Sequence, residues 1–166
     1  MADVLAELLP RAERIATRLA RRGETLAVVE SSAGGLISAA LLGVAGASAW
    51  FQAGAVVYTK AARATLLGLA EADLAGIRPA TEAYARLLAE TARARFGTHW
   101  AVAETGATGP TGNRYGDPAG HGCAAVAGPA AASTAWQTGE AARVPNMQRF
   151  AAATLDLLEK ALLRAG

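Results

Sequence analysis

Apolar residues recur along this chain with two different spacings, one typical of helices and one typical of strands. A first helix carries apolar residues at helical spacing from Leu5 to Leu19 and ends at Gly23. Pro10 indicates that this helix either starts near Pro10 or kinks there. Short runs rich in valine or alanine predict strands at residues 25–30, 54–58, 100–103, 122–127 and 134–138. Helical spacing predicts further helices at about 35–42, 60–67 and 82–95, and a last one from Pro145 or Asn146 onward.

Helices that alternate with strands indicate an α/β fold, a three-layer α/β/α sandwich in a single domain over residues 1–166. The last two strands form a possible hairpin through Gly128 and Pro129, so we expect a mixed, mostly parallel sheet. Ligands of such sheets bind beyond the carboxyl ends of the strands. Ser31, Tyr58 and Thr105 each follow or end a predicted strand and are expected to converge there.

The stretch from Leu26 to Leu36 predicts a strand, a tight turn and the start of a helix. Gly34 and Gly35 allow the backbone to turn sharply, and the start of the helix favours an anion or a developing oxyanion. A simpler interpretation is that Ser31 only completes the turn, and residue type alone favours it. The same holds for Ser48 in the next loop.

A second polar stretch, residues 104–120, is rich in glycine and hydroxyl residues and is predicted to be a long loop. Loops of this length inside a domain are usually functional. Together with the serine–glycine turn and Tyr58, the loop predicts a site for a small anionic ligand. Whether that site is catalytic stays open at this point.

The composition of the chain limits the classes of partner that it is expected to bind. Its 16 basic and 14 acidic residues give a net charge of +2, too balanced to indicate nucleic-acid binding. Cys123 is the single cysteine, which fits a reducing cytosol, and its small neighbours favour a structural thiol. His99 and His121 lack metal-ligand spacing, so no metal is expected. The chain has no apolar run of membrane-spanning length and no signal peptide, so a cytoplasmic location without membrane contact is expected.

Several segments resemble motifs of the CinA C-terminal family, the nicotinamide mononucleotide deamidases. ESSAGGL at 30–36 resembles the family's ESCTGG, and GASAWF at 46–51 resembles GSSAxF. GAVVYTKAARATLLG at 54–68 resembles GxVxYSNEAKxxLLG, and TGATGP at 105–110 resembles S/T-G-I-A-G-P. Pro79–Glu82 stands where the family has a V-S-E turn, and Arg143 stands for the arginine of its G-D-R segment. The matching segments occur in the family's order from about residue 5 to 163.

The resemblance implies a Ser/Lys-type amidohydrolase that needs no metal or other cofactor and is usually a homo-oligomer, with a dimer favoured. Its implied partner is a small-molecule pyridine nucleotide, since the family hydrolyses nicotinamide mononucleotide to nicotinate mononucleotide and ammonia. Carried over by position, the catalytic candidates are Ser31, Ser48, Tyr58, Arg63 and Thr105, with either serine as the nucleophile. The substrate-binding candidates are Glu30, Gly34, Gly35, Gly106, Gly109 and Arg143.

This chain departs from the family at positions that matter for chemistry. Arg63 stands where the family has a lysine, and a protonated arginine cannot act as a general base. Ser32 and Ala33 replace a cysteine and a threonine. The loop at 109–121 differs from the family's glycine-rich segments and carries side chains that those segments lack, namely Arg114, Tyr115, Asp117 and His121.

Three hypotheses follow from these departures. The first is an amidohydrolase with a substitute base, for which the candidates are Lys60, Tyr58 and His121. The second is a nucleotide-binding module that kept the pocket and lost the base. The third is a hydrolase of a different amide or ester.

Overall fold

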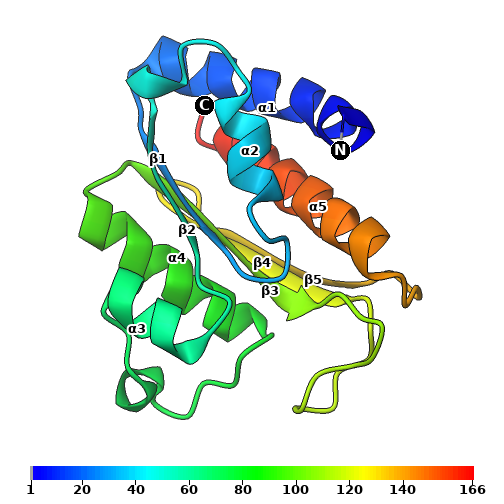
Figure 1. Cartoon of the computed structure of the whole chain (residues 1–166). Coiled ribbons are helices and arrows are strands. Elements are labelled where there is room, and N and C mark those ends of the chain that lie inside the picture. Colours follow the sequence, from blue (N-terminus) through cyan, green and yellow to red (C-terminus); the bar gives the residue numbers. More distant parts are fainter. Residues whose placement is uncertain (1) are drawn as a thin grey trace.

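A five-stranded sheet lies between two layers of helices in the computed structural model, which describes residues 2–166 (Figure 1). The strands are β1 (Leu26–Glu30), β2 (Phe51–Val56), β3 (Trp100–Ala107), β4 (His121–Ala127) and β5 (Ala132–Gln137). One face is covered by α1 (Ala2–Arg22), α2 (Leu36–Leu42) and α5 (Arg143–Arg164). The other is covered by α3 (Lys60–Leu67) and α4 (Glu82–Phe96). Short 3₁₀ turns are η1 (Ala47–Ala49) and η2 (Glu71–Leu74). The predicted α/β/α sandwich is therefore confirmed.

The strands are ordered β2-β1-β3-β4-β5. β1 pairs in parallel with β2 and with β3, whereas the β3–β4 and β4–β5 pairings are antiparallel. Four strands consequently run in one direction and β4 runs opposite to them. The sheet is mixed and mostly parallel in strand direction, as predicted, although its pairings divide evenly between the two kinds.

Alternate residues of the central strands face opposite helix layers, as the period of a strand requires. Val28 and Val102 pack against α1, α2 and α5, whereas Val29 and Ala103 pack against α3 and α4. Because both faces are covered, β1 is buried along its whole length. This rigid centre positions the residues that follow the carboxyl ends of β1 and β2.

Two strand boundaries differ from the sequence prediction. β2 runs from Phe51 to Val56 rather than over 54–58, because Phe51 already pairs with the first residue of β1. Tyr58 therefore lies two residues beyond the strand. β3 continues to Ala107, because its last residues form an antiparallel ladder with the start of β4. The predicted loop 104–120 thus begins only after residue 107.

The helix predictions are close to the observed bounds. Thr59 and Thr81 cap α3 and α4 by accepting hydrogen bonds from Ala62 N and Tyr84 N, as expected. Pro10 lies inside a continuous α1, and α5 begins at Arg143, slightly before its predicted start. Over residues 2–166, every helix is too short or too polar to cross a membrane.

Candidate functional site

A cavity of about 610 Å³ opens at the carboxyl edge of the sheet. It is lined by residues that follow β1 and β2, by the start of α4, by the end of β3 and by the loop after it: Ser31, Val57, Tyr58, Thr59, Lys60, Arg63, Pro79, Ala80, Tyr84, Thr105, Gly106, Asn113, Arg114 and Tyr115. The predicted convergence of Ser31, Tyr58 and Thr105 is confirmed. The described lining includes three cationic side chains and no carboxylate, which favours an anionic ligand.

The start of α2 already holds an anion, the carboxylate of Glu30. This fully buried side chain accepts hydrogen bonds from the backbone of Gly35 at 2.9 Å, Ile37 at 3.0 Å and Ser38 at 2.7 Å. The helix terminus is therefore neutralised from within the chain. Glu30 and the Gly35 amide belong to the fold, which corrects the prediction that they bind substrate.

The two glycines of the turn serve its geometry. Gly34 and Gly35 have φ angles of +68° and +103°, a backbone region that other residues rarely adopt. The Gly34 N–H donates to the Ser31 carbonyl at 3.2 Å, so it is not available as an oxyanion donor. A side chain at Gly34 would also approach Met147 Cε to 2.8 Å. The predicted ligand-binding role of these glycines is thus replaced by a structural one.

Glu104 supports the serine turn and is not among the site residues predicted from the sequence. Its fully buried carboxylate accepts hydrogen bonds from Ser31 N at 3.1 Å, from Ala33 N at 2.8 Å and from Ser32 Oγ. Burial raises the pKa of Glu104 from 4.5 to about 7, against the opposing effect of these hydrogen bonds. The sequence carries a signal for this role. Glu30 and Glu104 each end a buried apolar segment, and these two segments form the neighbouring strands β1 and β3.

Arg63 lies in the cavity wall with 3% of its surface exposed. Its guanidinium donates to the Leu69 carbonyl at 3.1 Å, to Tyr84 Oη at 3.3 Å and to Glu71 Oε2 at 3.1 Å. Burial alone would lower the pKa of Arg63, but the bonds to Tyr84 and Glu71 outweigh it and raise the pKa above its usual value. The residue is a permanent cation that joins α3 to α4.

The three candidate substitute bases have different surroundings. Lys60 Nζ lies 3.3 Å from Glu71 Oε1 at the exposed rim. Tyr58 is 60% exposed, and its oxygen accepts a hydrogen bond from Arg143 Nη2 at 3.0 Å. His121 Nε2 lies 2.8 Å from the Ala80 carbonyl, which requires the nitrogen to be a donor, and this residue is not among the described lining. His121 is therefore corrected from candidate base to structural donor.

Ser48 does not lie with Ser31. It is exposed in η1 before the start of β2, whereas Ser31 follows the end of β1. The five residues of β1 separate these two edges of the sheet by about 17 Å, at about 3.3 Å per residue. Within one chain, the prediction that both serines meet at the reacting centre is therefore wrong.

Arg143 was predicted to bind a phosphate, but its guanidinium is hydrogen-bonded to other residues of the chain. Its Nη1 donates to the Gly109 carbonyl at 2.6 Å while its Nη2 donates to Tyr58. Gly109 supplies the carbonyl that accepts this hydrogen bond and is not among the described residues of the cavity lining, whereas Gly106 is. The arginine orients Tyr58 and holds the start of the loop.

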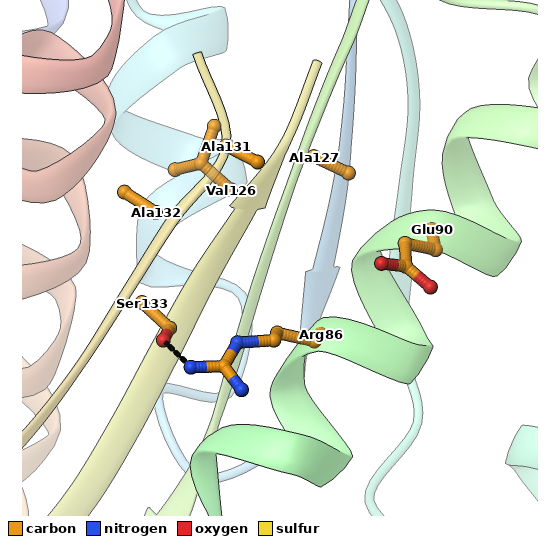
Figure 2. Close-up of a pocket in the computed structure, with 7 residues that line it drawn as sticks. All are labelled: Arg86, Glu90, Val126, Ala127, Ala131, Ala132 and Ser133. Atoms are coloured by element: carbon orange, nitrogen blue, oxygen red, sulfur yellow. Dashed lines mark hydrogen bonds between the residues drawn. The ribbon is translucent and has the colours of Figure 1, made fainter.

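A smaller cavity of about 180 Å³ lies between α4 and the β4–β5 hairpin (Figure 2). Figure 2 shows Arg86 reaching from α4 toward Ser133, to which it donates at 2.5 Å. The Ser133 hydroxyl in turn donates to Glu82 at 2.7 Å. Since Arg86 and Ser133 are hydrogen-bonded to each other and most of the wall is alanine and valine, this cavity is a weaker candidate than the one at the strand ends.

Comparisons with known proteins agree with this architecture. A family model described as the CinA C-terminal domain matches residues 9–162. A CinA-like protein of Anaeromyxobacter dehalogenans (strain 2CP-C) is 39% identical over 148 residues, covering 89% of this chain and 36% of the relative. A CinA-like protein of Chlorobium limicola is 35% identical, covering 86% and 34%. The chain thus spans about a third of the length of these curated relatives.

Solved structures match over nearly the whole chain. A competence-damaged protein (CinA) superfamily protein from Klebsiella pneumoniae has a TM-score of 0.86 at 23% identity, covering 95% of this chain and 98% of that one. A competence/damage inducible protein from Agrobacterium tumefaciens has a TM-score of 0.82 at 28% identity, covering 93% and 94%. The first of these likenesses shows the fold alone, and both agree with the three-layer sandwich.

Proposed function

Because this chain belongs to the CinA C-terminal domain family, we propose that it is an amidohydrolase acting on the carboxamide of nicotinamide mononucleotide or a closely related pyridine nucleotide. The products are the corresponding carboxylate and ammonia. The observation that carries the proposal is the single cavity that gathers the hydroxyls of Ser31, Tyr58 and Thr105 beside cationic side chains. Hydroxyl nucleophiles suit acyl transfer, and the cations suit a phosphorylated substrate.

In this proposal Ser31 Oγ attacks the carbonyl carbon of the amide. The Tyr58 oxygen accepts the serine proton while Tyr58 passes its own phenolic proton to the amide nitrogen, so that ammonia leaves and an ester with Ser31 remains. Water then hydrolyses the ester and restores the serine. Arg143 donates to the Tyr58 oxygen at 3.0 Å, which orients the phenol for this proton transfer. Thr105, buried beside the cavity, orients the carboxamide.

A second candidate function is a nucleotide-binding module without turnover. It is favoured by Arg63, which occupies the place of the family lysine as a buried and fully paired cation. Ammonia release from nicotinamide mononucleotide by the purified chain separates the two candidates. Tight binding of the mononucleotide without any ammonia would support the binding module.

Replacing Ser31 with alanine is expected to lower ammonia release by at least about 10³-fold, because the nucleophile is lost. The change leaves the backbone bond to Glu104 in place, so the thermal unfolding midpoint should stay within about 2 °C. Ammonia would be followed in a coupled assay. Full activity in Ser31→Ala would contradict the assignment.

Ser48→Ala is the matched serine variant and should keep its activity, since Ser48 lies at the opposite edge of the sheet. Loss of activity in this variant would instead show that Ser48 reaches the cavity from a second copy of the chain.

A further inference from the structure

We propose that Arg114, at the tip of the loop after β3, binds the phosphate group of a nucleotide in the large cavity. This inference deepens the proposed function and rests on it for the identity of the nucleotide. Arg114 lines the cavity together with its neighbours Asn113 and Tyr115. The subsite would therefore take a phosphate monoester and discriminate a mononucleotide from its nucleoside.

The backbone around Arg114 is held in one shape by the side chain of Asn113. The Asn113 Oδ1 accepts hydrogen bonds from Tyr115 N at 3.0 Å and from Asp117 N at 3.1 Å. Its Nδ2 donates to Asp117 Oδ2 at 2.8 Å, and the Asn113 backbone N–H donates to the Asp117 carbonyl at 3.0 Å. These bonds close residues 113–117 into a compact turn that contains Arg114, whose side chain is exposed.

Arg78 anchors this turn to the segment that precedes α4. Its guanidinium donates to both carboxylate oxygens of Asp117, at 2.6 and 3.3 Å. The same guanidinium lies 5.7 Å from the centre of the Tyr115 ring, within the range of a cation–π contact. The loop tip is thus fixed in place before a ligand arrives, which lowers the entropy lost on binding.

The other cations of the site are already committed to partners. Lys60 and Arg63 share the carboxylate of Glu71, and both terminal nitrogens of Arg143 bind Tyr58 and Gly109. Within the part of the chain that the structure describes, Arg114 makes no ion pair and is exposed. Its planar guanidinium can donate two parallel hydrogen bonds to a phosphate.

The size of the cavity agrees with this assignment. Its volume of about 610 Å³ lies within the range of about 300–1,000 Å³ usual for small-molecule sites. Ser31 and Thr105 border the cavity from the sheet, whereas Arg114 and Tyr115 border it from the loop. A nucleotide can therefore place its reacting amide toward the strand ends and its phosphate toward the loop tip.

The test is a pair of calorimetric titrations with nicotinamide mononucleotide and nicotinamide riboside, which differ by the phosphate. Arg114→Gln should weaken binding of the mononucleotide by at least about 10-fold, the size of a lost charge-assisted bond. Binding of the riboside should change by less than about 2-fold. Arg21→Gln on α1, next to the opposite edge of the sheet, removes the same charge and should change neither titration.

Equal losses for both ligands in Arg114→Gln, or no loss for the mononucleotide, would overturn the inference. Its failure can be told apart from failure of the proposed function. A wild-type chain that binds the mononucleotide through Arg114 without releasing ammonia retains the phosphate subsite and refutes the amidohydrolase. Ammonia release with an unchanged KM in Arg114→Gln would support the amidohydrolase and refute the phosphate subsite. Adenosine monophosphate serves as a second probe, and no Arg114-dependent binding of either mononucleotide would also overturn the subsite.

Discussion

Replacing Glu104 with alanine is expected to lower the free energy of unfolding by about 3–5 kcal/mol. The substitution leaves the donors Ser31 N, Ala33 N and Ser32 Oγ without their shared acceptor, and both Ser32 and Ala33 are buried. Each such group costs about 1–3 kcal/mol when it is left unpaired. Urea denaturation monitored by circular dichroism measures the loss.

Glu90→Ala on the exposed side of α4 is the matched control and should change the free energy of unfolding by less than about 0.5 kcal/mol. Glu104→Gln keeps one acceptor oxygen and should fall between the two variants. A Glu104→Ala protein as stable as the Glu90→Ala protein would refute the supporting role of this carboxylate.

The raised pKa of Glu104 also makes stability depend on pH. Burial raises the pKa of its carboxyl to about 7 in the folded chain, against 4.5 ordinarily, so the folded state binds this proton more tightly than the unfolded state. Its contribution is fully present below pH 4.5 and is lost as the pH rises through 7, by up to about 3 kcal/mol. Glu104→Gln should remove this dependence, so the stability difference between the two proteins should change across that window. A constant difference would contradict the assignment.

The second large effect is expected at Arg63. If the missing lysine is what limits turnover, Arg63→Lys should raise ammonia release by at least about 10-fold, because a buried lysine can lose its proton whereas arginine cannot. The same change should lower the free energy of unfolding by about 1–3 kcal/mol, since lysine cannot reproduce the bonds to Leu69, Tyr84 and Glu71. Activity and urea denaturation would be measured on the same preparation.

Arg63→Met separates these two effects, because it removes the guanidinium without supplying an amine. It should lose stability and gain no activity. An Arg63→Lys protein with unchanged turnover would mean that position 63 is not where the base belongs in this chain, which leaves Tyr58 and Lys60 as the candidates.

Features set by neighbouring residues were predictable from the sequence. Thr59 and Thr81 cap their helices as expected because a cap depends on the three following residues. The meeting of Ser31 and Thr105 was also predictable, because parallel strands end at the same edge of a sheet. The alternation of helices and strands predicted the order of the elements and the layered architecture.

Features set by partners distant in sequence were not predictable in this way. The length of β3 depends on its ladder with β4, which no local pattern near Gly106 reveals. Arg143 and Tyr58 are 85 positions apart, and their hydrogen bond diverts the arginine from its expected ligand. The separation of Ser48 from Ser31 follows from the register of β1 and β2. Each of these requires the three-dimensional pairing of segments.

The two buried glutamates that hold the turn around Ser31 do so through backbone N–H groups and the hydroxyl of Ser32. None of these bonds involves the side chain at position 31. The shape of the turn is consequently independent of the side chain at position 31, which we propose as the nucleophile. A cysteine, threonine or alanine could occupy position 31 on an unchanged scaffold, so the chemistry of this site can diversify through one side chain without redesign of the backbone.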